Sequence, residues 1–461
     1  MRFSRLRSAS TESQGDPSPV SFAEAVRTWA KIAALSFGGP AGQIAVMQRI
    51  LVDEKRWVSQ RRFLHALNYC MLLPGPEAQQ LATYLGWLLH GWRGGLVAGT
   101  LFVFPGAVAI LGLSMLYVLY RRIATVDALF YGLKAAVLAI VLEAVIRIGR
   151  RSLRNATMIG IAGVAFVSIF FFEVPFPLII LGAALVGWLG ELARPGLFAP
   201  ASEQEEAERR VIDDRADRLR TPRAGRLLKV VAIWCALWSI PFVAVAAVLG
   251  TDHVLFTEAA FFSKMSVVTF GGAYAVLAYV AQEAVETYGW LRPGEMLDGL
   301  GMAETTPGPL IMVLQFVGFL GAYRDPLPLA PMTAAVLGAA VTTWVTFVPC
   351  FLWIFAGAPY VEWLRGRRGP SGSLAAITAA VVGVILNLAV WFGIHVFFGA
   401  VDERHLDRLR LLVPDLATLD PWALALSLGA FVALFGFRQG MIRTLLATAI
   451  LGMVVDLTIR G

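Results

Sequence analysis

The stretch that decides the fold is Lys31-Ile-Ala-Ala-Leu-Ser-Phe-Gly-Gly39, followed by Trp57 and Pro74-Gly75-Pro76, because the chain contains it twice. Adding 233 to each number gives Lys264-Met-Ser-Val-Val-Thr-Phe-Gly-Gly272, Trp290 and Pro307-Gly308-Pro309 without a gap. We call the interruptions the FGG breaks (37–39 and 270–272) and the PGP breaks (74–76 and 307–309). Broken backbone at membrane depth is tolerated only where protein buries it or where it lines a cavity. Matching breaks in two halves are typical of a secondary transporter's binding site.

The composition around these breaks indicates a polytopic membrane protein. Of 461 residues, 57% are hydrophobic and 15% are charged, and the mean hydropathy is +0.68. This is too apolar for a soluble domain of such length. The net charge of +7 comes mostly from arginines that flank apolar segments and lack interleaved aromatic residues. Cytoplasmic loops explain this pattern better than nucleic-acid binding does.

Known catalytic and metal-binding patterns are not visible in the sequence. The three cysteines are far apart in apolar segments and are interpreted as small hydrophobic residues. The histidines have no metal-ligand spacing, and neither a Ser/His/Asp arrangement nor a phosphate-binding loop is present. We therefore expect no catalytic residues, no metal and no cofactor, and a protein that is not an enzyme.

The duplication predicts an all-α polytopic membrane protein with two homologous halves, whose helices are broken or re-entrant at the FGG and PGP motifs. The expected parts are a disordered cytoplasmic tail (1–21), an N-terminal repeat (22–193), a charged cytoplasmic linker (194–227), a linking transmembrane helix (228–250) and a C-terminal repeat (251–461). The linking helix has no counterpart in the first half. An odd number of crossings then separates equivalent elements, which predicts inverted topology.

Charge placement favours broken helices that enter and leave one membrane face. With the linker in the cytoplasm, the basic loop Arg49 to Arg62 lies inside and its acidic counterpart lies outside. Full crossings would reverse both loops, and the sequence leaves this choice open.

The doubled pattern resembles the chromate ion transporter family, in its long two-domain form. The likeness covers nearly all of the chain beyond the tail. It rests on the following motifs: Ser36 to Pro40 with Gln43, Arg56-Trp57, Leu73 to Pro76, Tyr84 to Gly86, Phe270 to Gly272, Glu304 to Pro309 and Phe316 to Gly318. The resemblance implies export of chromate from the cytoplasm, driven by the proton gradient, across the inner membrane of a bacterial cell, and chromate resistance. Ala273 departs from the pattern because the first half has Pro40 there.

A tetrahedral dianion needs several donors that converge without forming a permanent trap. Helices interrupted in mid-membrane supply such donors, because their N-terminal N–H groups and positive dipole ends face the break. The residues expected to bind substrate are Lys31, Ser36, Phe37, Gly38, Gly39, Pro74, Gly75, Pro76, Lys264, Thr269, Phe270, Gly271, Gly272, Pro307, Gly308 and Pro309.

Four charged residues in the apolar segments each have a second interpretation. The paired Lys31 and Lys264 are expected to attract the anion, or else to extend toward the interface near a helix end. Glu304 and Glu77 are candidates for carrying the coupling proton, or else for capping a turn and a helix N-terminus.

Another pair, Lys134 and Glu143, lies on one predicted span. Because the two are about two and a half helical turns apart, they do not face each other directly. We expect both to form structural pairs with other helices.

Other functions remain open on the sequence alone. The same scaffold could transport mainly sulfate or another tetrahedral oxyanion. Weaker alternatives are a membrane-embedded enzyme, for which no acid/base or metal arrangement is found, and a channel. The expected partners are chromate or sulfate, protons and the lipid bilayer, without nucleic acid, and a homodimer is left open.

Overall fold

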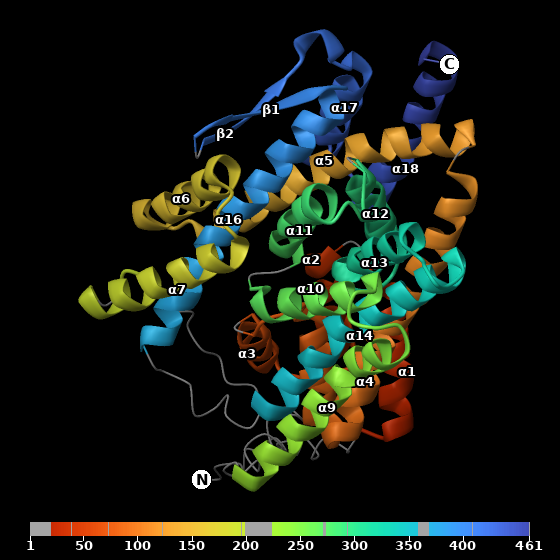
Figure 1. Ribbon diagram of the computed structural model, residues 1–461. Coiled ribbons are helices and arrows are strands. Elements are labelled where there is room, and N and C mark those ends of the chain that lie inside the picture. Colours follow the sequence, from red (N-terminus) through yellow and green to blue (C-terminus); the bar gives the residue numbers. More distant parts are fainter. Residues whose placement is uncertain are drawn as a thin grey trace, which may run out of the picture.

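The computed structural model describes residues 20–37, 39–71, 73–121, 123–194, 196–198, 224–270, 273–292, 294–357, 368–407 and 409–460 (Figure 1). Most of the predicted tail and most of the predicted linker lie outside these residues. Among the described residues, seven helices are long and apolar enough to span a membrane. The prediction of a mostly α-helical polytopic membrane protein is therefore confirmed.

The first repeat begins with helices that stop at the breaks. Its elements are α1 (Phe22–Leu35), α2 (Gly39–Gln48), the π-helix η1 (Arg49–Glu54), α3 (Gln60–Cys70) and α4 (Glu77–Tyr120). The hydroxyl of Ser21 caps α1 by accepting the N–H of Glu24. After Leu35 the chain leaves the helical path and resumes it at Gly39, whose φ of +68° suits glycine.

Helix α4 is a hairpin of two helical parts. Its backbone is non-helical at His90 and Gly91, where the chain turns back. The two parts pack so closely that a Cβ on Gly86 or Gly94 would collide with the carbonyl oxygen of the other glycine. Small residues allow this approach of backbones, which is a common way to pack helices in membranes.

The second repeat has the same plan with a longer turn. Its elements are α10 (Val254–Val268), α11 (Ala273–Gln282), the π-helix η2 (Glu283–Thr287), α12 (Glu295–Thr305), the 3-10 helix η3 (Leu310–Met312), α13 (Val313–Arg324) and α14 (Pro331–Gly357). Here Gly318 and Gly338 make the close contact between α13 and α14. The hairpin of the first repeat is thus reproduced in the second.

The remaining helices pack around these elements: α5 (Ala124–Ser152), α6 (Ala156–Phe172), α7 (Phe176–Ala193), α9 (Ala224–Val248), α16 (Arg368–Phe397), α17 (Pro421–Phe435) and α18 (Met441–Val455), which continues into the π-helix η6 (Asp456–Arg460). Helix α16 packs on α5, α6 and α7, while α17 and α18 pack on α5. Figure 1 shows α5, α17 and α18 at the top of the view, α1, α4 and α9 at the bottom, and α2, α11 and α12 between them.

A small β-hairpin between α16 and α17 was not predicted. Strands β1 (Val401–Leu406) and β2 (Leu409–Pro414) pair antiparallel, and a 3-10 helix, η5 (Leu416–Thr418), follows them. The hairpin is fastened by Arg410, which is buried and lies 2.9 Å from both Glu173 and Glu286 and 3.1 Å from Glu403. It therefore ties the α6–α7 connection to η2 of the second repeat.

Candidate functional site

The four breaks meet crosswise between the repeats. The N–H of Gly75 in the first PGP break donates to the carbonyl of Thr269 before the second FGG break, at 2.8 Å. The N–H of Gly308 in the second PGP break donates to the carbonyl of Ser36 before the first FGG break, at 2.9 Å. The two donors are 233 positions apart in the sequence, and so are the two acceptors. The same contact thus occurs twice with the repeats exchanged, as a pseudo-two-fold relation requires.

The glycine of each PGP break has a conformation that other residues rarely adopt. The φ angle is +112° at Gly75 and +105° at Gly308. The hydroxyls of Ser36 and Thr269 also behave alike, because each donates to a carbonyl one turn earlier in its own helix, at Ile32 and Met265 respectively. Their hydrogens are thus used within α1 and α10.

Each PGP break also packs against a proline-bent helix of the other repeat. A Cβ on Gly308 would lie 3.0 Å from the Cα of Gly106, next to Pro105 in α4. A Cβ on Gly75 would lie 2.9 Å from Sγ of Cys350, next to Pro349 in α14. Gly106 and Cys350 occupy equivalent positions in the repeats, 244 apart. This contact was missed because nothing local in either sequence segment indicates its partner.

A helix begins directly after every break. Helices α2, α11 and α4 start at Gly39, Ala273 and Glu77, and η3 leads into α13 from Leu310. The first N–H groups of a helix lack partners within it, and the N-terminus carries partial positive charge. The crossing therefore gathers four helix starts, which is an arrangement suited to an anion.

Glu304 lies beside the first FGG break, just before the second PGP break, and is 1% exposed. Its Oε1 accepts the hydroxyl of Tyr274 at 2.6 Å, and its Oε2 has no hydrogen-bond partner among the described residues. A Cβ on Gly39 would lie 3.6 Å from both Glu304 Oε2 and the Tyr274 hydroxyl. The carboxyl thus connects the two FGG breaks and the second PGP break. Tyr274 was missed because the first repeat has Ala41 at its position.

Two glutamines add polar groups at the same place. The side-chain N–H of Gln43 donates to the carbonyl of Gly308, and that of Gln80 donates to the carbonyl of Pro74 at 2.6 Å. The Oε1 atoms of both are buried without a hydrogen-bond partner among the described residues. Buried polar atoms are normally satisfied, so unused groups here indicate a site for a polar ligand or water.

The other residues predicted to belong to the site differ in how exposed they are. Lys31 and Lys264 are exposed, and the Nζ of Lys31 lies 3.1 Å from Glu54. Glu77 is half-buried in the first turn of α4. Phe37 and Phe270 are also half-buried. Three predicted residues lie outside the described residues: Gly38, Gly271 and Gly272.

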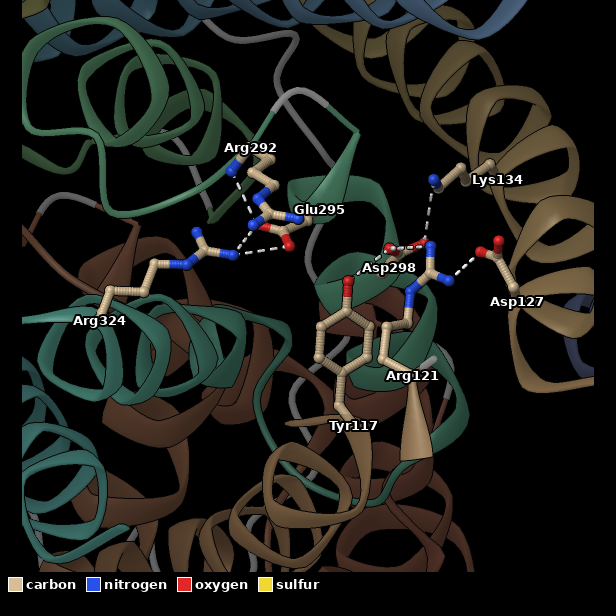
Figure 2. Close-up of polar contacts among 8 residues, drawn as sticks. All are labelled: Tyr117, Arg121, Asp127, Lys134, Arg292, Glu295, Asp298 and Arg324. Atoms are coloured by element: carbon tan, nitrogen blue, oxygen red, sulfur yellow. Dashed lines mark hydrogen bonds and ion pairs between the residues drawn. The ribbon is translucent and has the colours of Figure 1, made fainter. Parts of the chain in front are cut away.

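An ion network holds the other end of α12 (Figure 2). Asp298 is fully buried and accepts the hydroxyl of Tyr117 at 2.9 Å. Its carboxylate oxygens lie 3.6 Å from Lys134 Nζ and 3.7 Å from an Arg121 nitrogen. The structural pairing predicted for Lys134 is confirmed. Glu143 instead pairs within its own helix, with Arg147 at 3.2 Å.

Asp298→Asn is expected to destabilise this end of α12, because removing one partner of a buried ion pair costs about 3–5 kcal/mol. The midpoint of thermal unfolding of the purified protein in detergent should fall clearly below that of the wild type. Asp325→Asn, at an exposed acidic residue just after α13, is the matched control and should leave the midpoint unchanged. Equal midpoints for both variants would show that the network does not hold α12.

Two interlocked repeats of broken helices, set among membrane-spanning helices, define a polytopic membrane transporter. The family profile described as "Chromate transporter" matches residues 23–188 and 256–453. The chain therefore belongs to the chromate transporter family, whose members named below are transporters and not enzymes.

Individual relatives are also named as transporters. The chain is 31% identical over 391 residues to a chromate transport protein of Pseudomonas aeruginosa, covering 83% of each chain. It is 25% identical over 363 residues to a chromate transport protein of Cupriavidus metallidurans, covering 78% of this chain and 80% of that relative. An uncharacterized transporter of Bacillus subtilis, 26% identical, matches over 158 residues, which is 34% of this chain and 89% of that relative. No solved structure matches the chain significantly.

Proposed function

We propose that this protein is a secondary transporter that exports chromate from the cytoplasm across a bacterial inner membrane, coupled to the proton gradient, and so confers chromate resistance. The observation that carries the proposal is the crossing of the four breaks, with the buried carboxyl of Glu304 beside it. The names of the relatives support chromate as the substrate. The helix starts at the breaks suit an anion, and an anion bound there would lie next to the carboxyl group of Glu304.

The proposed substrate site is made of helix starts and amide groups. The N–H groups in the first turns of α2, α4 and α11 offer donors from several directions, whereas the N–H groups of Gly75 and Gly308 are used in the crossing itself. The predicted residues Ser36, Phe37, Pro74, Pro76, Thr269, Phe270, Pro307 and Pro309 shape this backbone. Dipoles hold a dianion without the deep trap that a pair of buried cations would form.

Glu304 is the proposed proton-binding group. A carboxylate and a dianion repel each other strongly in a site shielded from water. Chromate therefore binds best when Glu304 carries a proton, and by linkage bound chromate favours that proton. Glu77, at the start of α4, remains the second predicted candidate for this role.

The membrane potential also drives the proposed export. Moving one charge through the potential changes its free energy by roughly 2.3 kcal/mol per 100 mV. The loaded transporter carries the two negative charges of chromate and one added proton, so one net negative charge leaves a negative interior. The proton on Glu304 leaves against its own chemical gradient, so we expect the electrical part of the proton gradient to drive this step.

Energised inverted membrane vesicles that contain the protein are expected to accumulate chromate. Uptake should cease when an uncoupler collapses the gradient, and vesicles without the protein are the control. Separate collapse of the electrical and the chemical part of the gradient would tell which part drives transport. Uptake that is indifferent to both would contradict the coupling.

Sulfate or another tetrahedral oxyanion is the alternative substrate, because amide donors and helix starts recognise charge and shape rather than the central atom. Unlabelled sulfate added to the same vesicles should compete weakly with chromate if chromate is preferred. Competition at equal concentrations that removes most chromate uptake would favour the alternative.

A further inference from the structure

The contact between α10 and the α13–α14 hairpin encloses a second carboxyl group. Glu258 of α10 is 0% exposed. Neither of its oxygens has a hydrogen-bond partner among the described residues, and the backbone of Ala322 approaches the carboxyl without reaching hydrogen-bond geometry.

Glycines of the hairpin make the room for this carboxyl. A Cβ on Gly321 would lie 2.6 Å from Glu258 Oε1, and a Cβ on Gly338 would lie 2.9 Å from Oε2. The hydroxyl of Thr342, one turn beyond Gly338, is also buried without a hydrogen-bond partner among the described residues. The same glycine contact that closes the hairpin therefore encloses the carboxyl.

Among the residues that the structure describes, no opposite charge lies against Glu258 to balance its ionised form. Helix α14 contributes only Cys350 as a titratable group. Helix α13 offers Tyr323 and Arg324, and the guanidinium of Arg324 is bound to Glu295. Helix α9 carries Arg226, Lys229 and Cys235, α10 carries Lys264 and is capped by His253, and the ring of Tyr288 packs on Phe261 of α10. Arg226, Lys229 and Lys264 are exposed, and Nδ1 of His253 accepts the N–H of Leu255. An ionised carboxylate without a partner is strongly disfavoured away from water.

The carboxyl is also specific to the second repeat. The equivalent position in α1 is Ala25, which is buried. Glu304 is likewise matched by Met71, an apolar residue. The two repeats thus have similar backbones, but only the second has acidic residues at these two positions. A purely structural need for a carboxyl at the helix contact would apply to both repeats.

We propose that Glu258 is a second proton-binding residue, protonated when the α13–α14 hairpin is closed on α10 and deprotonated when the hairpin moves and admits water. Closing and opening of this glycine contact then carry one proton inward while the empty transporter returns, so the single net negative charge of the chromate-loaded step is unchanged. This inference rests on the proton-coupled export proposed above. It assigns proton handling to the second repeat, through Glu258 at the hairpin and Glu304 at the breaks.

The test measures protons and chromate together in reconstituted vesicles, with a pH-sensitive dye inside and labelled chromate outside. Glu258→Gln is expected to keep chromate binding while the proton-to-chromate ratio falls by about one, since a carboxyl carries one proton. The pH profile of transport should lose one titration step. The exposed Asp325→Asn is the matched control and should keep both values.

Two further observations keep the outcome decisive. If Glu258→Gln does not fold, Glu258→Met removes the same proton and places an apolar side chain of similar length in the enclosure. An unchanged ratio and pH profile in either folded variant would overturn the inference. Absence of any chromate movement by the wild-type protein would instead overturn the proposed function.

Discussion

Gly308→Ala is expected to lower chromate transport at least tenfold. The φ of +105° at this residue is strained for any side chain, and such strain costs on the order of 1–3 kcal/mol. The new methyl group would also lie 3.0 Å from the Cα of Gly106, and backbone atoms cannot rotate away. Relief requires the second PGP break to shift, which would break its bond to Ser36 and move Glu304.

The equivalent Gly75→Ala provides an informative comparison. The methyl group here meets Sγ of Cys350, at 2.9 Å, which is a side-chain atom. Cys350→Ala should therefore restore part of the transport lost in Gly75→Ala.

Initial rates of chromate uptake in vesicles, normalised to protein amount, measure these effects. Gly160→Ala is the control, because that glycine is exposed on α6 and its added methyl group meets nothing within 4 Å. A Gly308→Ala protein with the wild-type rate would show that the crossing of the breaks is not needed for transport.

Glu304→Gln is expected to separate chromate binding from proton coupling. Glutamine has the size of glutamate and still accepts the hydroxyl of Tyr274, but it cannot ionise. Chromate binding to the wild type should weaken by about tenfold per pH unit where Glu304 loses its proton. The variant should bind chromate equally well across that range, because the repulsion between carboxylate and dianion is gone.

Transport by this variant should fall selectively. Net accumulation against a gradient requires release of the proton and return of the empty transporter, so we expect a loss of at least tenfold. Exchange of labelled for unlabelled chromate across the membrane needs no such release and should persist. Calorimetric titration at several pH values and exchange assays give both readouts. A variant whose binding follows pH as the wild type does would exclude Glu304 as the coupling group.

The breaks could be predicted from the sequence because their causes are local. Paired glycines weaken a helix in both FGG motifs, and Pro40 adds to this in the first, so the ends of α1 and α10 follow from local sequence. The sequence also contains both copies, which reveals the repeat before any contact is known.

The partners at the breaks could not be predicted, because they are set by contacts between distant segments. Nothing near Gly75 indicates Cys350, and nothing near Glu304 indicates Tyr274. Equal positions of Lys31 and Lys264 in the repeats show that the two are related, but not which side of each helix faces the breaks. In the structure both lie on exposed faces, and the Lys31 ammonium meets Glu54.

The β-hairpin was missed for a similar reason. Strand β1 is dominated by charged residues, which resemble a solvated loop, and its anchor Arg410 finds Glu173 and Glu286 far away in the chain. Such a contact leaves no trace in local composition.

The exchanged hydrogen bonds also constrain the biogenesis of the protein. The carbonyl of Ser36 and the N–H of Gly75 enter the membrane long before the ribosome has made Gly308 and Thr269. Until then the nascent first half has open backbone positions that only the later half can fill. Assembly must therefore finish late, after synthesis has passed the second PGP break.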